Sequence, residues 1–207
     1  MRGRIEGRSV ADIGCMWKIN GAHSFLAEEI GASRVVAVDT YRTPEFDEEL
    51  ARRHSTVQFL AMDATTPGGL HDAFGVVDVV WCFGVLYHVL DPLQLMRNLR
   101  EVCGELLVLE TATIPEVPWL PQAACFFPYL PARSQQVWRD RSLPAGLAIS
   151  KDFDEAGATA NNFWGMSPSA VVAALRVCGF EVEHHEPSLH GTLRTVFFAR
   201  PLEVPGS

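Results

Sequence analysis

The chain has 207 residues, of which 48% are hydrophobic and 20% are charged, a composition typical of a globular enzyme with a sizeable core. Its formal net charge is −8, and its basic residues are scattered apart from Arg2, Arg4 and Arg8, which argues against nucleic acid as the main partner. No stretch approaches the roughly 18 consecutive apolar residues of a membrane span, and no apolar signal-peptide core follows the first arginines. We therefore expect a cytoplasmic protein that does not enter a membrane.

Residues 10–39 predict a strand, a turn, a helix and a second strand. Two short apolar runs, at 10–13 and 35–38, flank a stretch with apolar residues at helical spacing, which Gly31 ends. Asp12 ends the first strand and Asp39 the second. At the carboxyl edge of a parallel sheet, the amides of a tight turn and a following acid suit a nucleoside-containing ligand.

The next seventy residues repeat the strand–helix alternation. Short strands are expected at 57–61, 77–82 and 106–109, and helices at 70–74 and from Pro92 to a stop at Gly104. Five strands that alternate with helices in about 100 residues predict a parallel α/β sheet.

Residues 112–165 interrupt this rhythm with recurrent prolines and dense aromatic residues. A long insertion of this composition is expected to be functional, and we interpret it as a cap packed over a pocket. Ser167 and Pro168 then begin a helix that Gly179 ends, and the segments 181–185 and 192–199 predict a final antiparallel strand pair.

Several motifs together resemble a known enzyme family. They are Asp12-Ile13-Gly14-Cys15, Val35-Val36-Ala37-Val38-Asp39, Asp63 after the third strand, Phe83-Gly84-Val85-Leu86-Tyr87-His88 with Pro92, and Glu110-Thr111 followed by Asn162-Phe163-Trp164 and Ser167-Pro168. The chain resembles the class I S-adenosylmethionine-dependent methyltransferases, in a subgroup that includes small-molecule enzymes and tRNA wobble-uridine carboxymethyl transferases. The resemblance implies an α/β fold: a Rossmann-like, mostly parallel seven-stranded sheet with helices on both faces. We expect a single methyltransferase domain over residues 1–207, with the cap at 112–165 inserted after the fifth strand.

The same resemblance implies that S-adenosylmethionine is the cofactor and S-adenosylhomocysteine the product. Asp12 would contact the methionine amino group, Asp39 the ribose hydroxyls and Asp63 the adenine amine. The full set of implied cofactor residues is Asp12, Gly14, Cys15, Trp17, Gly21, Asp39, Thr40, Met62, Asp63, Ala64, Phe83 and Gly84.

The turn after the first strand departs from the family pattern. Relatives commonly carry a closely spaced Gly-x-Gly there, whereas residues 16–20 separate Cys15 from Gly21 in this chain. Either Gly21 supplies the second flexible position or Trp17 closes over the ligand. A catalytically weak, cofactor-binding pseudoenzyme or partner subunit is therefore an alternative.

His88 and Glu110 are the candidate catalytic residues. A base is needed only if the acceptor holds its proton at neutral pH. His88, just past the fourth strand, is best placed for this role, but it also suits a structural hydrogen bond. Glu110 would orient His88, hold a substrate hydroxyl or anchor a loop. The candidate substrate-binding residues are Tyr87, Trp119, Phe126, Tyr129, Asn162 and Trp164, although each also suits simple packing.

No metal is expected, because no acidic cluster accompanies the cofactor acids. The five cysteines lack CxxC spacing and indicate buried thiols in a reducing compartment. His184 and His185 are expected to be ordinary strand histidines.

We expect methyl transfer to a small organic molecule, at oxygen rather than at carbon or nitrogen. The alternative enzyme is a tRNA-modifying methyl or carboxymethyl transferase, which would need a basic surface. Few residues precede the first strand, so the cap or a second subunit would have to cover the site, and a homodimer is expected.

Overall fold

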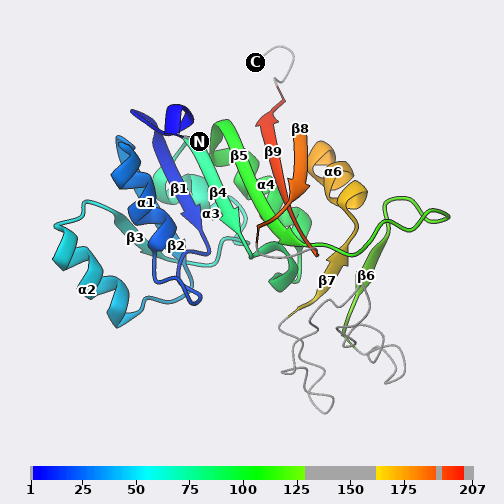
Figure 1. Cartoon of the computed structure of the whole chain (residues 1–207), viewed down its shortest axis with the longest axis horizontal. Coiled ribbons are helices and arrows are strands. Elements are labelled where there is room, and N and C mark those ends of the chain that lie inside the picture. Colours follow the sequence, from blue (N-terminus) through cyan, green and yellow to red (C-terminus); the bar gives the residue numbers. More distant parts are fainter. Residues whose placement is uncertain (1, 129–161, 190–192, 203–207) are drawn as a thin grey trace.

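A computed structural model gives the fold and describes residues 2–128, 162–189 and 193–202. It contains a seven-stranded sheet with helices on both faces (Figure 1). The strand order is β3-β2-β1-β4-β5-β9-β8. The strands are β1 Ser9–Ile13, β2 Arg34–Asp39, β3 Gln58–Ala61, β4 Val77–Phe83, β5 Cys103–Ala112, β8 Phe180–Pro187 and β9 Arg194–Pro201.

The first five strands pair in parallel, and β9 runs antiparallel to both β5 and β8. This confirms the mostly parallel sheet that the sequence predicts. The order of the strands reverses between β1 and β4. In open α/β sheets, ligands bind outside the carboxyl ends of the strands at such a reversal.

Helices pack on the two faces of the sheet. They are α1 Ala22–Ile30, α2 Pro44–Arg53, α3 Gly69–Phe74, α4 Pro92–Val102 and α6 Pro168–Val177, with short 3₁₀ turns η1 Arg2–Arg4 and η2 Leu86–His88. Helices α1 and α2 share a buried core with Val10, whereas α3, α4 and α6 share the other core with Ala11 and Ile13. This alternation along β1 is what a strand buried on both faces requires. None of the helices in the described ranges is both long and apolar enough to cross a bilayer.

Three helices begin with a side-chain cap followed by proline. Thr43, Asp91 and Ser167 each accept a hydrogen bond from a first-turn N–H, and Pro44, Pro92 and Pro168 follow them. The start of α6 at Ser167 and Pro168 was predicted, whereas α2 was not.

The predicted helix stop at Gly104 is wrong. Helix α4 ends at Val102, and β5 begins at once with Cys103 and continues to Ala112. Gly104 lies inside this strand, where an added Cβ would come within 3.1 Å of the carbonyl oxygen of Val77. The glycine therefore permits close approach to β4 and does not end the helix. Strand β8 likewise extends beyond the predicted 181–185.

The predicted cap segment is described in part. Strand β6 Ala124–Phe126 pairs antiparallel with β7 Trp164–Met166, and Thr113 bridges to Met166. Ile114, Ala123 and Phe127 form a small separate core. The N–H of Phe163 donates to the carbonyl of Tyr87 at 2.8 Å, which joins the segment before β7 to η2. The β6–β7 pair lies beyond the carboxyl ends of the parallel strands (Figure 1). The remainder of the cap, residues 129–161, lies outside the described residues.

Candidate functional site

The carboxyl edge of the sheet gathers most of the candidate residues. Asp12 lies near the end of β1, Asp39 ends β2, Asp63 follows β3, Phe83 ends β4 and Glu110 lies near the end of β5. Because these strands are parallel neighbours, their last residues lie along one edge. The predicted cofactor acids therefore lie at or just past the ends of three adjacent strands, β1, β2 and β3, on one side of the reversal.

Asp12 is almost fully buried, with 1% of its surface exposed. Its Oδ2 accepts a hydrogen bond from the hydroxyl of Ser24 in α1 at 2.6 Å. Burial raises the pKa of Asp12, and the Ser24 hydrogen bond and the neighbouring His23 only partly offset this effect. The side chain thus ties β1 to the first turn of α1.

Gly14 adopts a φ of +81°, a conformation that favours glycine. An added Cβ would lie 2.2 Å from Cγ2 of Val85. The missing side chain therefore makes room for the segment after β4. Its predicted role in letting the backbone approach a ligand stays a prediction.

The long turn after Cys15 folds back against β2 and α2. Cys15 and Met16 are buried, and the N–H of Met16 donates to Oδ2 of Asp39 at 2.8 Å. The hydroxyl of Thr43 donates to Oδ1 of Asn20 at 3.1 Å.

Gly21 has a φ of +77°, in the left-handed region. This conformation fits the first of the two alternatives from the sequence, in which Gly21 supplies the second flexible position of the turn. An added Cβ on it would collide with the ring of Phe46 in α2. Trp17, in contrast, exposes 66% of its surface. The Nζ atom of Lys18 lies 5.6 Å from the centre of the Trp17 ring.

The two acids that follow β2 and β3 accept hydrogen bonds from their own turns. Oδ1 of Asp39 accepts from the N–H of Thr40 at 2.7 Å, and Oδ1 of Asp63 accepts from the N–H of Thr65 at 2.8 Å. The N–H of Met62 donates to the carbonyl of Asp39 at 2.9 Å, which holds the two turns together. Asp39 is half-buried and Asp63 is exposed, so both carboxylates are accessible to a ligand.

Arg194, at the start of β9, is a site residue that the sequence reasoning missed. Its guanidinium pairs with both oxygens of Glu110, with Nη2 2.5 Å from Oε2, and Nη1 donates to the Tyr87 hydroxyl at 3.0 Å. Burial opposes the charged form of Arg194, but its hydrogen bonds to Glu110 and Tyr87 outweigh this and raise its pKa. An added Cβ on Gly84 would come within 3.2 Å of Nη2. This pair therefore adjoins the tip of β4.

The predicted catalytic residues occupy different environments. Glu110 is 5% exposed and is held by Arg194. His88 is exposed at the end of η2, and its ring centre lies 4.0 Å from that of Tyr87. The structure thus links Glu110 to Tyr87 through Arg194 and places the ring of His88 next to that of Tyr87.

His23, in the first turn of α1, is a second residue that sequence reasoning missed. Its Nδ1 is buried without a hydrogen-bond partner within the described residues, as is Nε1 of Trp81. The rings of both residues contact Phe83, with centres at 5.0 and 5.9 Å. Its position two residues after Gly21, in the first turn of α1 beside Ser24, is the sequence signal for His23.

The candidate substrate residues are not all together. Phe126 and Trp164 face each other across β6 and β7, with ring centres 4.8 Å apart. Trp164 Nε1 donates to the carbonyl of Leu90 at 3.0 Å, just past His88. Asn162 is half-buried, and Trp119 is 85% exposed. Tyr129 lies outside the described residues.

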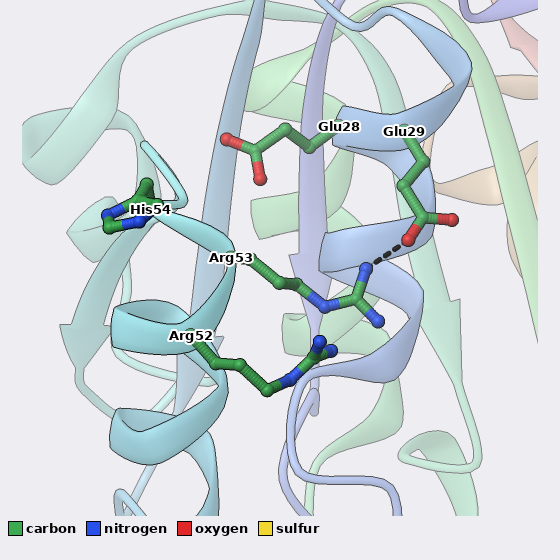
Figure 2. A pocket seen from close by; sticks show the side chains of 5 residues that line it. All are labelled: Glu28, Glu29, Arg52, Arg53 and His54. Atoms are coloured by element: carbon green, nitrogen blue, oxygen red, sulfur yellow. Dashed lines mark hydrogen bonds and ion pairs between the residues drawn. The ribbon is translucent and has the colours of Figure 1, made fainter.

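The described part of the surface has two hollows of a size that suits a ligand. One, of about 460 Å³, is lined by Glu28, Glu29, Arg52, Arg53 and His54 (Figure 2). It lies at the carboxyl ends of α1 and α2, away from the strand tips, and its arginines pair with glutamates. The other, of about 430 Å³, includes Arg194 and His185 and adjoins the start of β9. Within the described ranges, no group of three or more potential ligands could hold a metal ion.

Comparisons with known proteins agree with this geometry. A family model described as a methyltransferase domain matches residues 11–105. A tRNA U34 carboxymethyltransferase from Trichodesmium erythraeum is 29% identical over 100 residues, which cover 48% of this chain and 30% of that protein. One from Shewanella sp. is 35% identical over 123 residues, which cover 53% and 33%. The match thus spans about a third of the length of these curated relatives.

Solved structures share the fold over nearly the whole chain. The 1,6-didemethyltoxoflavin-N1-methyltransferase of Burkholderia thailandensis, solved with its substrate and S-adenosylhomocysteine, has a TM-score of 0.63 at 16% identity and covers 96% of this chain and 72% of its own. Magnesium protoporphyrin IX methyltransferase from Synechocystis, with bound S-adenosylhomocysteine, has a TM-score of 0.62 at 16% identity and covers 96% and 76%. The domain matched over residues 11–105, the shared fold and the related tRNA U34 carboxymethyltransferases together support a class I S-adenosylmethionine-dependent methyltransferase.

Proposed function

We propose that this protein transfers a methyl group from S-adenosylmethionine to an oxygen of a small organic acceptor. The observation that carries the cofactor assignment is the placement of Asp12, Asp39 and Asp63 at or just past the carboxyl ends of β1, β2 and β3, on one side of the reversal between β1 and β4. S-adenosylmethionine would supply an electrophilic methyl group, so the protein has mainly to position the acceptor and exclude water.

The residues present suit such a cofactor. A carboxylate has about four lone-pair sites, and each oxygen of Asp39 accepts one backbone N–H. Asp39 therefore retains acceptor capacity for a ribose diol, and the exposed Asp63 can accept from an adenine amine. Asp12 would supply negative charge for the methionine ammonium group.

The acceptor side would be built from η2 and the β6–β7 sheet. His88 would act as the base for a hydroxyl that is protonated at neutral pH. Tyr87, Phe126 and Trp164 would hold the acceptor beside it. Since Arg194 already holds both oxygens of Glu110, we assign Glu110 a positioning role, acting through Arg194 on Tyr87.

The pairing of the basic residues favours a small acceptor over RNA. Binding to RNA needs cations that are available to phosphates. Seven arginines of the described part form ion pairs with acids of the same chain: Arg4, Arg8, Arg42, Arg52, Arg53, Arg194 and Arg200. These pairs reduce the number of cations that the described part of the chain offers to phosphates, and the net charge of the whole chain is −8.

Two measurements test this proposal. Isothermal titration with S-adenosylhomocysteine should show saturable binding, and mass spectrometry of reactions supplied with S-adenosylmethionine should show a 14 Da gain on a hydroxylated member of an acceptor panel. No binding in the titration would refute the cofactor assignment. Binding without turnover on any acceptor, including tRNA, would favour the cofactor-binding pseudoenzyme or partner subunit.

A second candidate function is carboxymethyl transfer to tRNA. One observation favours it: the curated relatives carry that name. In reactions supplied with a donor whose sulfonium carries a carboxymethyl group in place of the methyl group, a 58 Da gain on tRNA uridine would support this candidate. A 14 Da gain on a small hydroxylated molecule from S-adenosylmethionine would refute it.

The cap over residues 112–165, a single domain, a homodimer and a cytoplasmic location stay predictions. Light scattering measures the dimer directly. A monomer that binds S-adenosylhomocysteine would show that no second subunit is needed to complete the site.

A further inference from the structure

Asn98 is a polar side chain of helix α4 that is completely buried. Its amide nitrogen donates to two backbone carbonyls, at 2.7 Å to Ala64 and at 2.8 Å to Thr66. Its amide oxygen accepts from Nε2 of Gln94 at 2.8 Å. Because carbonyl oxygens can only accept, these partners settle which way the amide points. A buried amide that is satisfied in this way holds the segments it joins in one position.

Both carbonyls belong to the turn that carries Asp63. Ala64 and Thr66 flank Thr65, whose N–H and hydroxyl both donate to Oδ1 of Asp63, at 2.8 and 2.7 Å. Asn98 therefore holds the chain on both sides of the residue that orients the Asp63 carboxylate. Among the described residues, both bonds of this carboxylate go to Oδ1, so Oδ2 is left to accept from a ligand.

The strand before this turn gives it little support. Strand β3 lies at one edge of the sheet, has four residues and contains no buried one. The N–H of Met62 still donates to the carbonyl of Asp39 at 2.9 Å. Within the described part of the chain, the hydrogen bonds that tie residues 63–66 to another element are the two from Asn98. The position of Asp63 therefore depends on α4 more than on the sheet.

We propose that Asn98 is a positioning residue for adenine recognition, because its two hydrogen bonds hold the turn of residues 63–66 so that the Asp63 carboxylate meets the exocyclic amine of the cofactor. The inference rests on the proposed cofactor and on the predicted role of Asp63. Asn98 is fully buried and both of its N–H groups are used, so it acts through the turn and not by contact with the ligand. Its effect should therefore require both the amine of the ligand and the carboxylate of Asp63.

The test compares the affinities of two ligands by isothermal titration. They are S-adenosylhomocysteine and its 6-deamino analogue, whose purine lacks only the exocyclic amine. Asn98→Leu keeps a side chain of similar size and removes both donors, whereas Asn98→Gln offers the donors again on a longer arm. Val102→Ala is the matched control, since Val102 is equally buried in the last turn of α4. It loses core packing and leaves the bonds of Asn98 in place. Circular dichroism and thermal melting check that each variant folds.

The wild-type protein should prefer S-adenosylhomocysteine over the deamino analogue by about tenfold or more, as for one hydrogen bond to a charged group. Asn98→Leu should reduce this preference to about threefold or less, and Asn98→Gln should recover part of it. Val102→Ala should melt at a lower temperature with the preference unchanged. Should Asn98→Leu fail to fold, Gln94→Ala takes its place. It removes the donor that orients the Asn98 amide and should lower the preference about threefold or more.

A double-mutant cycle with Asp63→Ala separates positioning from general destabilisation. Without the Asp63 carboxylate, Asn98→Leu should change the affinity for S-adenosylhomocysteine by less than about twofold. An undiminished preference in Asn98→Leu, or in Gln94→Ala where that variant replaces it, would overturn the inference. An equal loss of preference in Val102→Ala, or additive losses in the cycle, would do the same.

The wild-type titrations distinguish this inference from the proposed function. A wild-type protein that binds both ligands equally well would overturn the inference, because Asp63 would then not recognise the amine, and would leave the cofactor assignment intact. Failure of the wild-type protein to bind S-adenosylhomocysteine at all would overturn the proposed function itself, and the inference with it.

Discussion

The backbone N–H of Met16 donates to Oδ2 of Asp39 at 2.8 Å, so the acid that ends β2 also closes the long turn after β1. The other oxygen of Asp39 accepts from Thr40. One carboxylate therefore holds two turns at the carboxyl edge while it remains the candidate ligand of a ribose. The five residues between Cys15 and Gly21 are thus anchored to the neighbouring strand at the position where a ligand is expected.

Asp39→Asn should weaken both stability and cofactor binding. Asparagine has one side-chain oxygen, so its amide N–H would face one of the two backbone donors. A donor left unpaired in this way costs about 1–3 kcal/mol. Urea unfolding should show this loss, hydrogen exchange of the Met16 amide should accelerate, and titration should show weaker binding of S-adenosylhomocysteine.

Asp63→Asn is the matched control, because Asp63 is exposed and, among the described residues, its carboxylate bonds only to Thr65 of its own turn. It should weaken binding with a much smaller loss of stability. Equal stability losses for the two variants would contradict the anchoring role of Asp39.

Arg194→Met should be strongly destabilising because it leaves Glu110 buried without its cation. Removal of one partner from a buried ion pair costs about 3–5 kcal/mol, and Glu110 is only 5% exposed. The double variant Glu110→Gln with Arg194→Met should regain much of that loss in urea unfolding. Additive losses from the two changes would show that the pair is not energetically coupled.

The order of the strands and helices could be predicted because most of them follow local patterns. The strand at 77–83 is nearly continuous in apolar residues, and Ser167-Pro168 is a local helix start. Helix α2 was missed because Phe46 is its only fully buried residue. Its apolar face was too narrow to recognise, although Thr43-Pro44 gave a start signal.

The site residues that were missed depend on contacts distant in sequence. Arg194 meets Glu110 only because β9 returns antiparallel beside β5, across 84 residues. No periodicity in either segment encodes that register. The surroundings of His23 likewise depend on contacts with Phe83 and Asp12, which lie on different strands. Asp12, Asp39 and Asp63 were predictable because each lies at or just past the carboxyl end of an evident strand.

The cysteines should differ sharply in reactivity towards a thiol reagent. Burial raises the pKa of Cys15 and Cys82 strongly and that of Cys103 to about 12, so few thiolates form at pH 8. Cys125, in β6, is the half-buried one among five free cysteines. Ellman's reagent should therefore react first with one thiol, and with the others only in guanidinium. Cys125→Ser should abolish the early phase and Cys178→Ser should leave it. An early phase that survives Cys125→Ser would contradict this order of burial.

Asp12→Asn should stabilise the protein at neutral pH while it weakens cofactor binding. Burial raises the pKa of Asp12 above its usual 3.8, so the folded state holds this proton more tightly than the unfolded state. Wild-type stability should then fall as pH rises from about 3.8 through the folded pKa, with the full penalty above it. Asparagine keeps an acceptor for Ser24 and carries no charge. Its advantage in free energy of unfolding should grow from pH 4 to pH 7.5, and titration should show weaker binding of S-adenosylhomocysteine.

Asp78→Asn provides a control of opposite sign. Hydrogen bonds from Ser9 lower the pKa of Asp78, so this carboxylate stabilises the fold above the unfolded pKa, and the contribution is lost as pH falls through the folded pKa. Asp78→Asn should therefore lose stability relative to the wild type at pH 7.5 and approach it in acid. If the free energies of unfolding of Asp12→Asn and the wild type differed by the same amount at every pH from 4 to 7.5, Asp12 would not titrate with a raised pKa. The corner it shares with His23 would then be more hydrated than its burial indicates.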